Sequence, residues 1–174
     1  ASRLWQTLPV AAGALVETGP DLIDLFVPGR SLFERTTRAA ANETGWLPQL
    51  RDLVARKAAS PPDPSLQQSA LFDQYTRVLE TLARQKPLLL VLDDLQWADA
   101  GSTSLLFHLG RHIEGSRILI VGAYRPEEVA LRREGKRHPL QPVVNELKRH
   151  FGDIVVNLGR AEGREFLEAF LDTE

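Results

Sequence analysis

Residues 87–99 read Pro-Leu-Leu-Leu-Val-Leu-Asp-Asp-Leu-Gln-Trp-Ala-Asp, an unbroken apolar run that ends in two adjacent carboxylates. The five aliphatic residues at 88–92 predict a strand buried on both faces, which is typical of a parallel sheet covered by helices. Asp93 and Asp94 follow at the carboxyl end of this strand, where open α/β sheets bind their ligands. A carboxylate pair at that place can hold Mg²⁺ and can orient or deprotonate a water molecule.

The same pattern also fits a strand, a turn and a helix cap, because Asp is favoured at turns and caps. The downstream sequence favours a chemical role. Asp99 or Ser102 can cap a helix over 103–113, and a second apolar strand over 118–123 ends beside Arg125. A strand, a helix and a second strand form one βαβ unit, so the acids and the guanidinium are expected at one edge of the sheet.

Three stretches together resemble a known family: Leu-Leu-Val-Leu-Asp-Asp-Leu-Gln-Trp-Ala-Asp at 89–99, Ser-Leu-Leu at 104–106, and Gly-Ala-Tyr-Arg-Pro-Glu at 122–127. They look like the Walker B and sensor part of the STAND-class, AAA-like P-loop ATPase modules of large bacterial regulators. The resemblance implies that Asp93 binds Mg²⁺, that Asp94 activates water, and that Arg125 acts near the γ-phosphate of ATP. It therefore implies ATP or ADP with Mg²⁺ as cofactors, and Asp94 and Arg125 as catalytic residues.

The phosphate loop of that family is missing from these residues. Such a loop reads Gly-x-x-x-x-Gly-Lys-Ser/Thr and cradles phosphates with backbone N–H groups. The Gly-Lys pair at 135–136 is followed by Arg137, and the chain begins at Ala1 and contains no Met. We expect a loop and strand upstream, outside these residues, and a fragment that is inactive alone. The expected fold is α/β, a partial P-loop NTPase (AAA-like) three-layer fold of parallel strands flanked by helices, with the phosphate-loop strand missing.

The organisation along the chain predicts one partial AAA-like ATPase domain over 1–174. It divides into a helical region at 1–59, a proline-rich linker at 60–64, a Walker B and sensor core at 65–130, and a C-terminal strand and helix at 131–174. Three prolines within the linker disfavour regular structure. Ser65 is expected to cap a strong amphipathic helix that leads into the first strand.

The C-terminal region is expected to hold a helix at 142–150, a strand at 154–158 and a final helix at 161–171. The resemblance implies that the phosphate-loop strand lies between the strands at 118–123 and 154–158. Without it, sheet edges and an apolar sheet face would be exposed. We therefore expect a homodimer or strand exchange.

Composition excludes several classes of protein. The absence of Cys rules out disulfides and thiolate metal sites, and a net charge of −2 gives no electrostatic case for direct nucleic-acid binding. No apolar run approaches the roughly 20 residues of a membrane span, and the residues at the start of this sequence lack a charged region followed by an apolar signal core. The expected location is the cytoplasm, with no contact with a membrane.

Other residues are given structural interpretations. His108 and His112 lie four apart on the predicted helix, but no third ligand accompanies them, so a zinc site is disfavoured. Trp97 is expected to pack against the sheet rather than to stack on a base. The basic cluster at 131–138 contains interspersed acids and is expected to be a solvated loop.

These observations predict a fragment of an ATP-binding or ATPase regulatory switch in signal transduction or transcription control. Its partners would be other domains of a larger regulator. Two alternatives remain. The chain could be a non-catalytic scaffold or protein-interaction module that retains the ATPase fold. More distantly, it could be a metal-dependent hydrolase that uses the Asp pair without a nucleotide.

Overall fold

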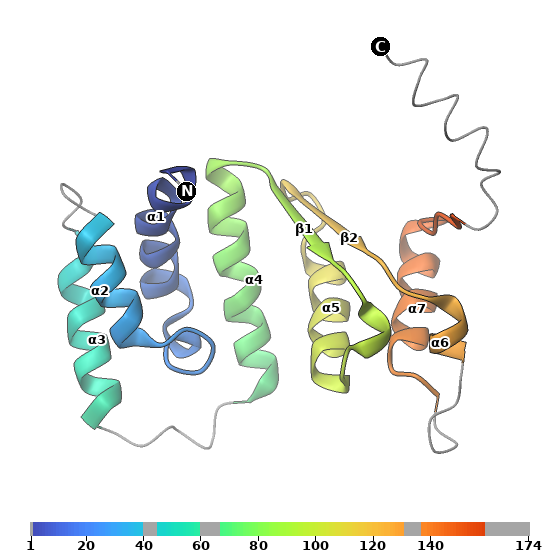
Figure 1. The fold of residues 1–174 in the computed structure, drawn as a ribbon, viewed down its shortest axis with the longest axis horizontal. Helices are drawn as coiled ribbons and strands as arrows, with labels where there is room; N and C mark the ends of the chain where they lie inside the picture. Colours follow the sequence, from blue (N-terminus) through green and yellow to red (C-terminus); the bar gives the residue numbers. More distant parts are fainter. Residues whose placement is uncertain (1, 40–44, 60–66, 131–136, 159–174) are drawn as a thin grey trace, which may run out of the picture.

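The computed structural model describes residues 2–39, 45–59, 67–130 and 137–158 (Figure 1). In chain order its elements are α1 (Ser2–Thr18), η1 (Pro20–Leu22), α2 (Gly29–Ala39), α3 (Leu47–Ala59), α4 (Gln68–Gln85), β1 (Leu88–Leu92), η2 (Leu95–Trp97), α5 (Ala100–His112), β2 (Ile118–Gly122), α6 (Pro126–Ala130) and α7 (Leu140–Phe151). The two η elements are single 3₁₀ turns. Helices α2 and α3 lie at one end of the molecule, and α6 and α7 lie at the other (Figure 1).

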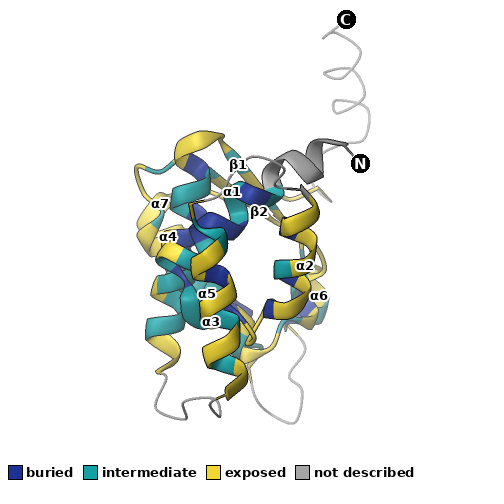
Figure 2. Cartoon of the chain, turned by 90° about the vertical axis from the view of Figure 1, so that its left-hand side faces the viewer, coloured by how far each residue is buried: buried dark blue, intermediate teal, exposed yellow. Residues whose placement is uncertain are grey.

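Helix α1 lies between two apolar layers of the helical region. Its Ala12 is buried with Ile23, Leu32 and Leu50 against α2 and α3. Its Ala14 is buried with Leu22 and Val78, on the side of α4. The buried positions face inward and the outer helix faces are exposed (Figure 2). The described residues before the proline-rich linker are mostly helical, in α1, η1, α2 and α3. None of the described helices combines the length and the apolar character that crossing a membrane requires.

Strands β1 and β2 pair in parallel, with Leu88 opposite Ile118 and Leu92 opposite Gly122. Helix α5 connects them, and it lies behind the sheet in the view of Figure 1. The predicted strand over 88–92 is confirmed, and so is the strand–helix–strand unit. A parallel pair with a helical crossover, in a chain rich in helix, agrees with the expected α/β class.

The prediction that the first strand is buried on both faces is wrong. Burial alternates along both strands, and one face of the sheet carries aliphatic side chains that are 46–65% exposed: Leu89, Val91, Leu119 and Val121. Registered partners in a parallel pair share a face, so these four side chains form one patch. Within the described residues, helices cover only the opposite face.

The predicted strand at 154–158 is also wrong. Those residues have no regular secondary structure, and Val156 is 81% exposed. An isolated strand cannot satisfy its own backbone N–H and C=O groups, and β1 and β2 are the only paired strands in the described residues.

Several predicted boundaries change. The amphipathic helix begins at Gln68 with Gln67 as its N-cap, rather than with the predicted cap at Ser65. The helix predicted at 142–150 is confirmed and is longer, spanning α7. The linker at 60–64, the helix at 161–171 and residues 131–136 of the basic cluster at 131–138 lie outside the described residues.

The N-terminus of α5 is capped by the Asp99 side chain. Its Oδ1 accepts a hydrogen bond from the backbone N–H of Ser102 at 2.6 Å. That bond lowers the pKa of Asp99, because it stabilises the ionised carboxylate. Asp99 rather than Ser102 is therefore the cap that orients the helix following the strand end.

We expect Asp99→Ala to lower the melting temperature at pH 7. The folded-state pKa is depressed, so this stabilisation is present above the unfolded pKa of about 3.9 and is lost as the pH falls through the folded value. The melting-temperature gap between Asp99→Ala and the parent chain should therefore narrow in acid. Asp99→Asn is the control, since Asn caps helices without ionising. A pH-independent gap between Asp99→Ala and the parent would contradict the assignment.

The exposed sheet patch of Leu89, Val91, Leu119 and Val121 predicts self-association. We expect multi-angle light scattering of the 174-residue chain to show dimers that increase with concentration, because pairing would bury this patch. Val91→Thr combined with Leu119→Thr should shift the equilibrium toward monomer, because Thr is polar and, being β-branched, still suits a strand. Leu25→Thr, at an exposed position of the helical region, is the matched control. A monodisperse monomer at every concentration would refute this prediction.

Candidate functional site

Backbone hydrogen bonds that continue beyond the strands keep the ends of β1 and β2 side by side. The N–H of Ala123 donates to the carbonyl of Leu92 at 2.8 Å, and the N–H of Leu95 donates to the carbonyl of Ala123 at 2.9 Å. The acidic pair between Leu92 and Leu95 is therefore flanked by bonds to the second strand. Arg125 follows Ala123 by two residues, so all three candidate residues lie at the same edge of the sheet.

Asp94 has a left-handed backbone conformation, with φ 55° and ψ 38°. This conformation costs most residues about 1–2 kcal/mol, and short polar side chains tolerate it best. The N–H of Asp94 donates to Oδ1 of Asp93 at 2.9 Å, and the carbonyl of Asp94 accepts from the N–H of Trp97 at 2.9 Å. The sharp turn directs the chain into η2 and leaves both carboxylates exposed.

The Gln96 side chain bridges the two strand ends, between Asp94 and the backbone of Arg125. It is only 3% exposed. Its Nε2 donates to Oδ1 of Asp94 at 2.7 Å, and its Oε1 accepts from the backbone N–H of Arg125 at 3.2 Å. Its backbone carbonyl lies 2.8 Å from Nε2 of His138. Sequence reasoning did not single out Gln96; the signal was one polar residue between Leu95 and Trp97, whose burial only the folded chain reveals.

The Arg125 side chain points toward α6 rather than to the acidic pair. Its Nη1 lies 3.2 Å from Oε1 of Glu128, and the guanidinium side chain is 70% exposed. Exposed ion pairs contribute about 0–1 kcal/mol, so this contact restrains the guanidinium only weakly. The geometry brings the backbone of Arg125 to the site and leaves its charge free to reorient toward an anion.

The donors at this edge fit part of a magnesium–nucleotide site. Mg²⁺ prefers oxygen ligands and is commonly held by one or two carboxylates together with waters and substrate phosphates. Asp93 and Asp94 supply such carboxylates on exposed backbone. Among the described residues no cluster of three or more His, Cys, Asp or Glu surrounds a metal position.

The histidine pair lies elsewhere, between α4 and α5. The rings of His108 and His112 stack with centroids 4.1 Å apart, and Nε2 of His108 lies 3.2 Å from Oδ1 of Asp73 without the alignment of a hydrogen bond. Burial lowers the pKa of His108, the charge of His112 lowers it further, and Asp73 opposes both. Among the described residues, this pair is not part of a group of three or more His, Cys, Asp or Glu that could hold a metal ion.

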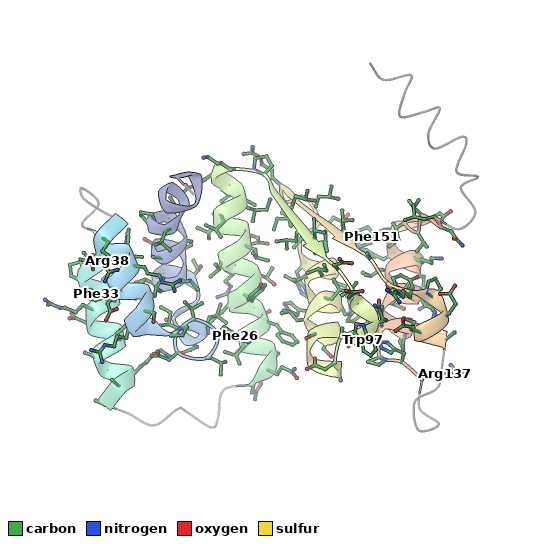
Figure 3. All side chains as sticks on the ribbon, viewed as in Figure 1. Phe26, Phe33, Arg38, Trp97, Arg137 and Phe151 are labelled. Carbon is green, nitrogen blue, oxygen red and sulfur yellow. The ribbon has the colours of Figure 1, made fainter. Side chains whose placement is uncertain are left out.

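Trp97, which was predicted to pack against the sheet, has a side chain that is 62% exposed. It lies at the η2 turn, between α5 and α6 (Figure 3). After the left-handed turn at Asp94, Gln96 rather than Trp97 is the buried residue of η2.

A hollow of about 280 Å³, lined in part by Arg84, Ser116 and Arg117, lies at the amino ends of the strands. It is therefore at the opposite end of the sheet from Asp93, Asp94 and Arg125 and has no bearing on the acidic pair.

Comparison with known proteins supplies a family. A model of the AAA ATPase domain matches residues 8–121, about two thirds of the chain, from α1 through most of β2. The match includes Asp93, Asp94 and Gln96 and ends before Arg125. Searches of curated proteins and of solved structures find no match. This match agrees with the paired parallel strands and the acidic strand end. The chain therefore belongs to the AAA ATPase domain family.

Proposed function

We propose that this chain supplies the acidic and sensor part of a Mg²⁺–nucleotide site in a STAND-class regulatory ATPase. Asp93 holds Mg²⁺, Asp94 orients and deprotonates the attacking water, and Arg125 acts at the γ-phosphate. ATP or ADP with Mg²⁺ are the cofactors, and the partners are other domains of the same regulator in the cytoplasm. The nucleotide state would set how these domains associate, in signal transduction or transcription control.

One observation carries the proposal. Two parallel strands end side by side, and two adjacent carboxylates and an arginine follow them at the same edge of the sheet. The chain that carries them belongs to the AAA ATPase domain family. The N-terminus of α5 is capped by Asp99 and does not need either of these acids. The exposed pair Asp93 and Asp94 caps no described helix through its side chains, which favours a chemical role.

The residues have separable tasks in hydrolysis. A carboxylate at Asp94 can accept the proton of a water that attacks the terminal phosphorus, as ADP departs. The guanidinium of Arg125 can leave its exposed pair with Glu128 to meet the charge on the phosphoryl oxygens. Bound Mg²⁺ would neutralise phosphate charge. Most phosphate contacts are assigned to a Gly-rich loop, a sequence that these 174 residues do not contain.

We expect the 174-residue chain alone to bind MgATP too weakly for a large thermal shift. A ligand at 100 times its dissociation constant stabilises a protein by about 2.7 kcal/mol, which differential scanning calorimetry detects readily. We expect no such shift with millimolar MgATP. A shift of that size, abolished by Asp93→Ala, would show that the phosphate loop is dispensable or replaced.

The native protein that carries this sequence provides the direct test, after intact mass and peptide mapping define its N-terminus. Asp93→Ala should weaken Mg²⁺-dependent ATP binding, measured by fluorescent-nucleotide titration. Asp94→Asn should preserve that binding and depress hydrolysis by about 10²–10⁴-fold, the usual contribution of a general base. Asn is chosen because it tolerates the left-handed backbone of Asp94.

Equal hydrolysis by Asp94→Asn and the parent would remove the water-activating role. A native N-terminus near Ala1, with ATP binding unaffected by Asp93→Ala, would favour the alternative of a non-catalytic scaffold or interaction module. The large exposed sheet patch is the observation that favours this alternative.

A further inference from the structure

We infer that Gln96 is a positioning residue for hydrolysis, which sets the orientation of the Asp94 carboxylate and ties it to the strand end that carries Arg125. The inference rests on the proposed function, because it assigns Gln96 a task at the same site. It concerns a side chain that acts through Asp94 and Arg125, without contact with the nucleotide.

The hydrogen bonds of Gln96 are directional at both ends. The amide nitrogen must be the donor to the carboxylate oxygen of Asp94, at 2.7 Å. The amide oxygen must be the acceptor from the N–H of Arg125, at 3.2 Å. The primary amide offers a donor and an acceptor on one planar group, so both contacts depend on the same side chain.

Burial makes the arrangement rigid. Gln96 is 3% exposed, and its backbone carbonyl lies within hydrogen-bond distance of His138, whose Nδ1 accepts from the N–H of Leu140 at 3.1 Å. A ring that accepts at Nδ1 when neutral carries its proton on Nε2, so His138 donates to Gln96. Gln96 is therefore anchored at its backbone and satisfied at its side chain, which a buried amide requires.

The consequence for Asp94 is a fixed carboxylate plane. With Oδ1 engaged by Gln96, the second oxygen, Oδ2, is the one assigned to water. An exposed carboxylate without this contact would rotate about its last torsion and sample many orientations. Hydrogen bonds that orient the ligands of a metal typically matter by about 10–100-fold in activity, and we expect a bond that orients a reacting carboxylate to matter to a similar degree.

Two substitutions separate the contacts. Gln96→Met removes both hydrogen bonds at similar volume. Gln96→Glu keeps an acceptor for Arg125 but replaces the donor to Asp94 with a second carboxylate. The introduced carboxyl group can donate to Asp94 only when protonated. We expect burial and the neighbouring acid to favour the protonated form of this carboxyl group, so the rate relative to that of the parent should recover as the pH falls.

Gln74 provides a matched control. Its Nε2 donates to Oδ2 of Asp21 at 2.8 Å, and its Oε1 accepts from the N–H of Asp21 at 3.0 Å. The contact has the same chemistry as that of Gln96, but it joins α4 to η1 in the helical region. Gln74→Met and Gln74→Glu therefore report the cost of losing such a contact away from the strand ends.

The experiment measures kcat and KM for MgATP in the native protein from about pH 5.5 to 8.5, a range that spans the ordinary pKa of His. Rates are expressed as a ratio to the parent at each pH. Any pH dependence that the variant and the parent share cancels in this ratio. The charged groups around Gln96 are Asp94 and Asp93 from the strand end and the Arg125–Glu128 pair at α6, and His138 before α7 is the titratable ring beside it. Thermal unfolding of each variant establishes the range in which it is folded.

We expect Gln96→Met to lower kcat by about 10–100-fold with little change in KM. Gln96→Glu should show a similar loss at pH 8 and a rising rate ratio as the pH falls. The Gln74 variants should change stability without a pH-dependent change in kcat. If Gln96→Met does not fold, Gln96→Glu at acidic pH gives the same answer through its recovery.

The outcomes distinguish two failures. If Asp94→Asn abolishes hydrolysis but the Gln96 and Gln74 variants behave alike, the positioning role is refuted and the proposed function stands. If hydrolysis is absent or indifferent to Asp94→Asn, the proposed function fails and Gln96 loses its assigned role with it.

Discussion

The parallel pairing of β1 with β2 determines where the candidate residues lie. The two strands pair over five residues each. Backbone hydrogen bonds from Ala123 to Leu92 and from Leu95 to Ala123 continue this pairing into the turn beyond β1. The acidic pair lies between Leu92 and Leu95, the two residues of this segment that make those bonds. Its position relative to Arg125 therefore follows from backbone geometry, and side chains refine it afterwards.

The turn at Asp94 combines a structural cost with a chemical use. A left-handed residue is disfavoured, and the neighbouring hydrogen bonds to Asp93 and Gln96 offset that cost. The same turn exposes the carboxylates and buries Gln96. A straight continuation of the strand would alternate side chains between the two faces of the sheet. The turn instead brings two consecutive acids to the edge.

Local patterns predicted the elements well where the pattern was long or sharply ended. The apolar run at 88–92, the second strand, the cap at Asp99 and the helix α4 follow from periodicity and polarity in the sequence. Errors occurred where an outcome depended on partners distant in sequence. Val91 is exposed although its run is uniformly aliphatic, and Ile154 has no strand to pair with in the described part of the chain. Likewise, the acids could be placed at a strand end from sequence, whereas the two-sided contact of Gln96 with Asp94 and Arg125 could not.

Helix α4 is shared by both halves of the structure. Its buried face includes Val78 and Leu79, it contacts α1 on one side, and it contacts the sheet and α5 on the other. Neither half can then lose its structure without uncovering apolar surface in the other. The expected consequence is one cooperative unfolding transition for the described chain. A ligand that stabilised the strand ends would protect the distant helices α2 and α3 from proteolysis as well, through their common dependence on α4.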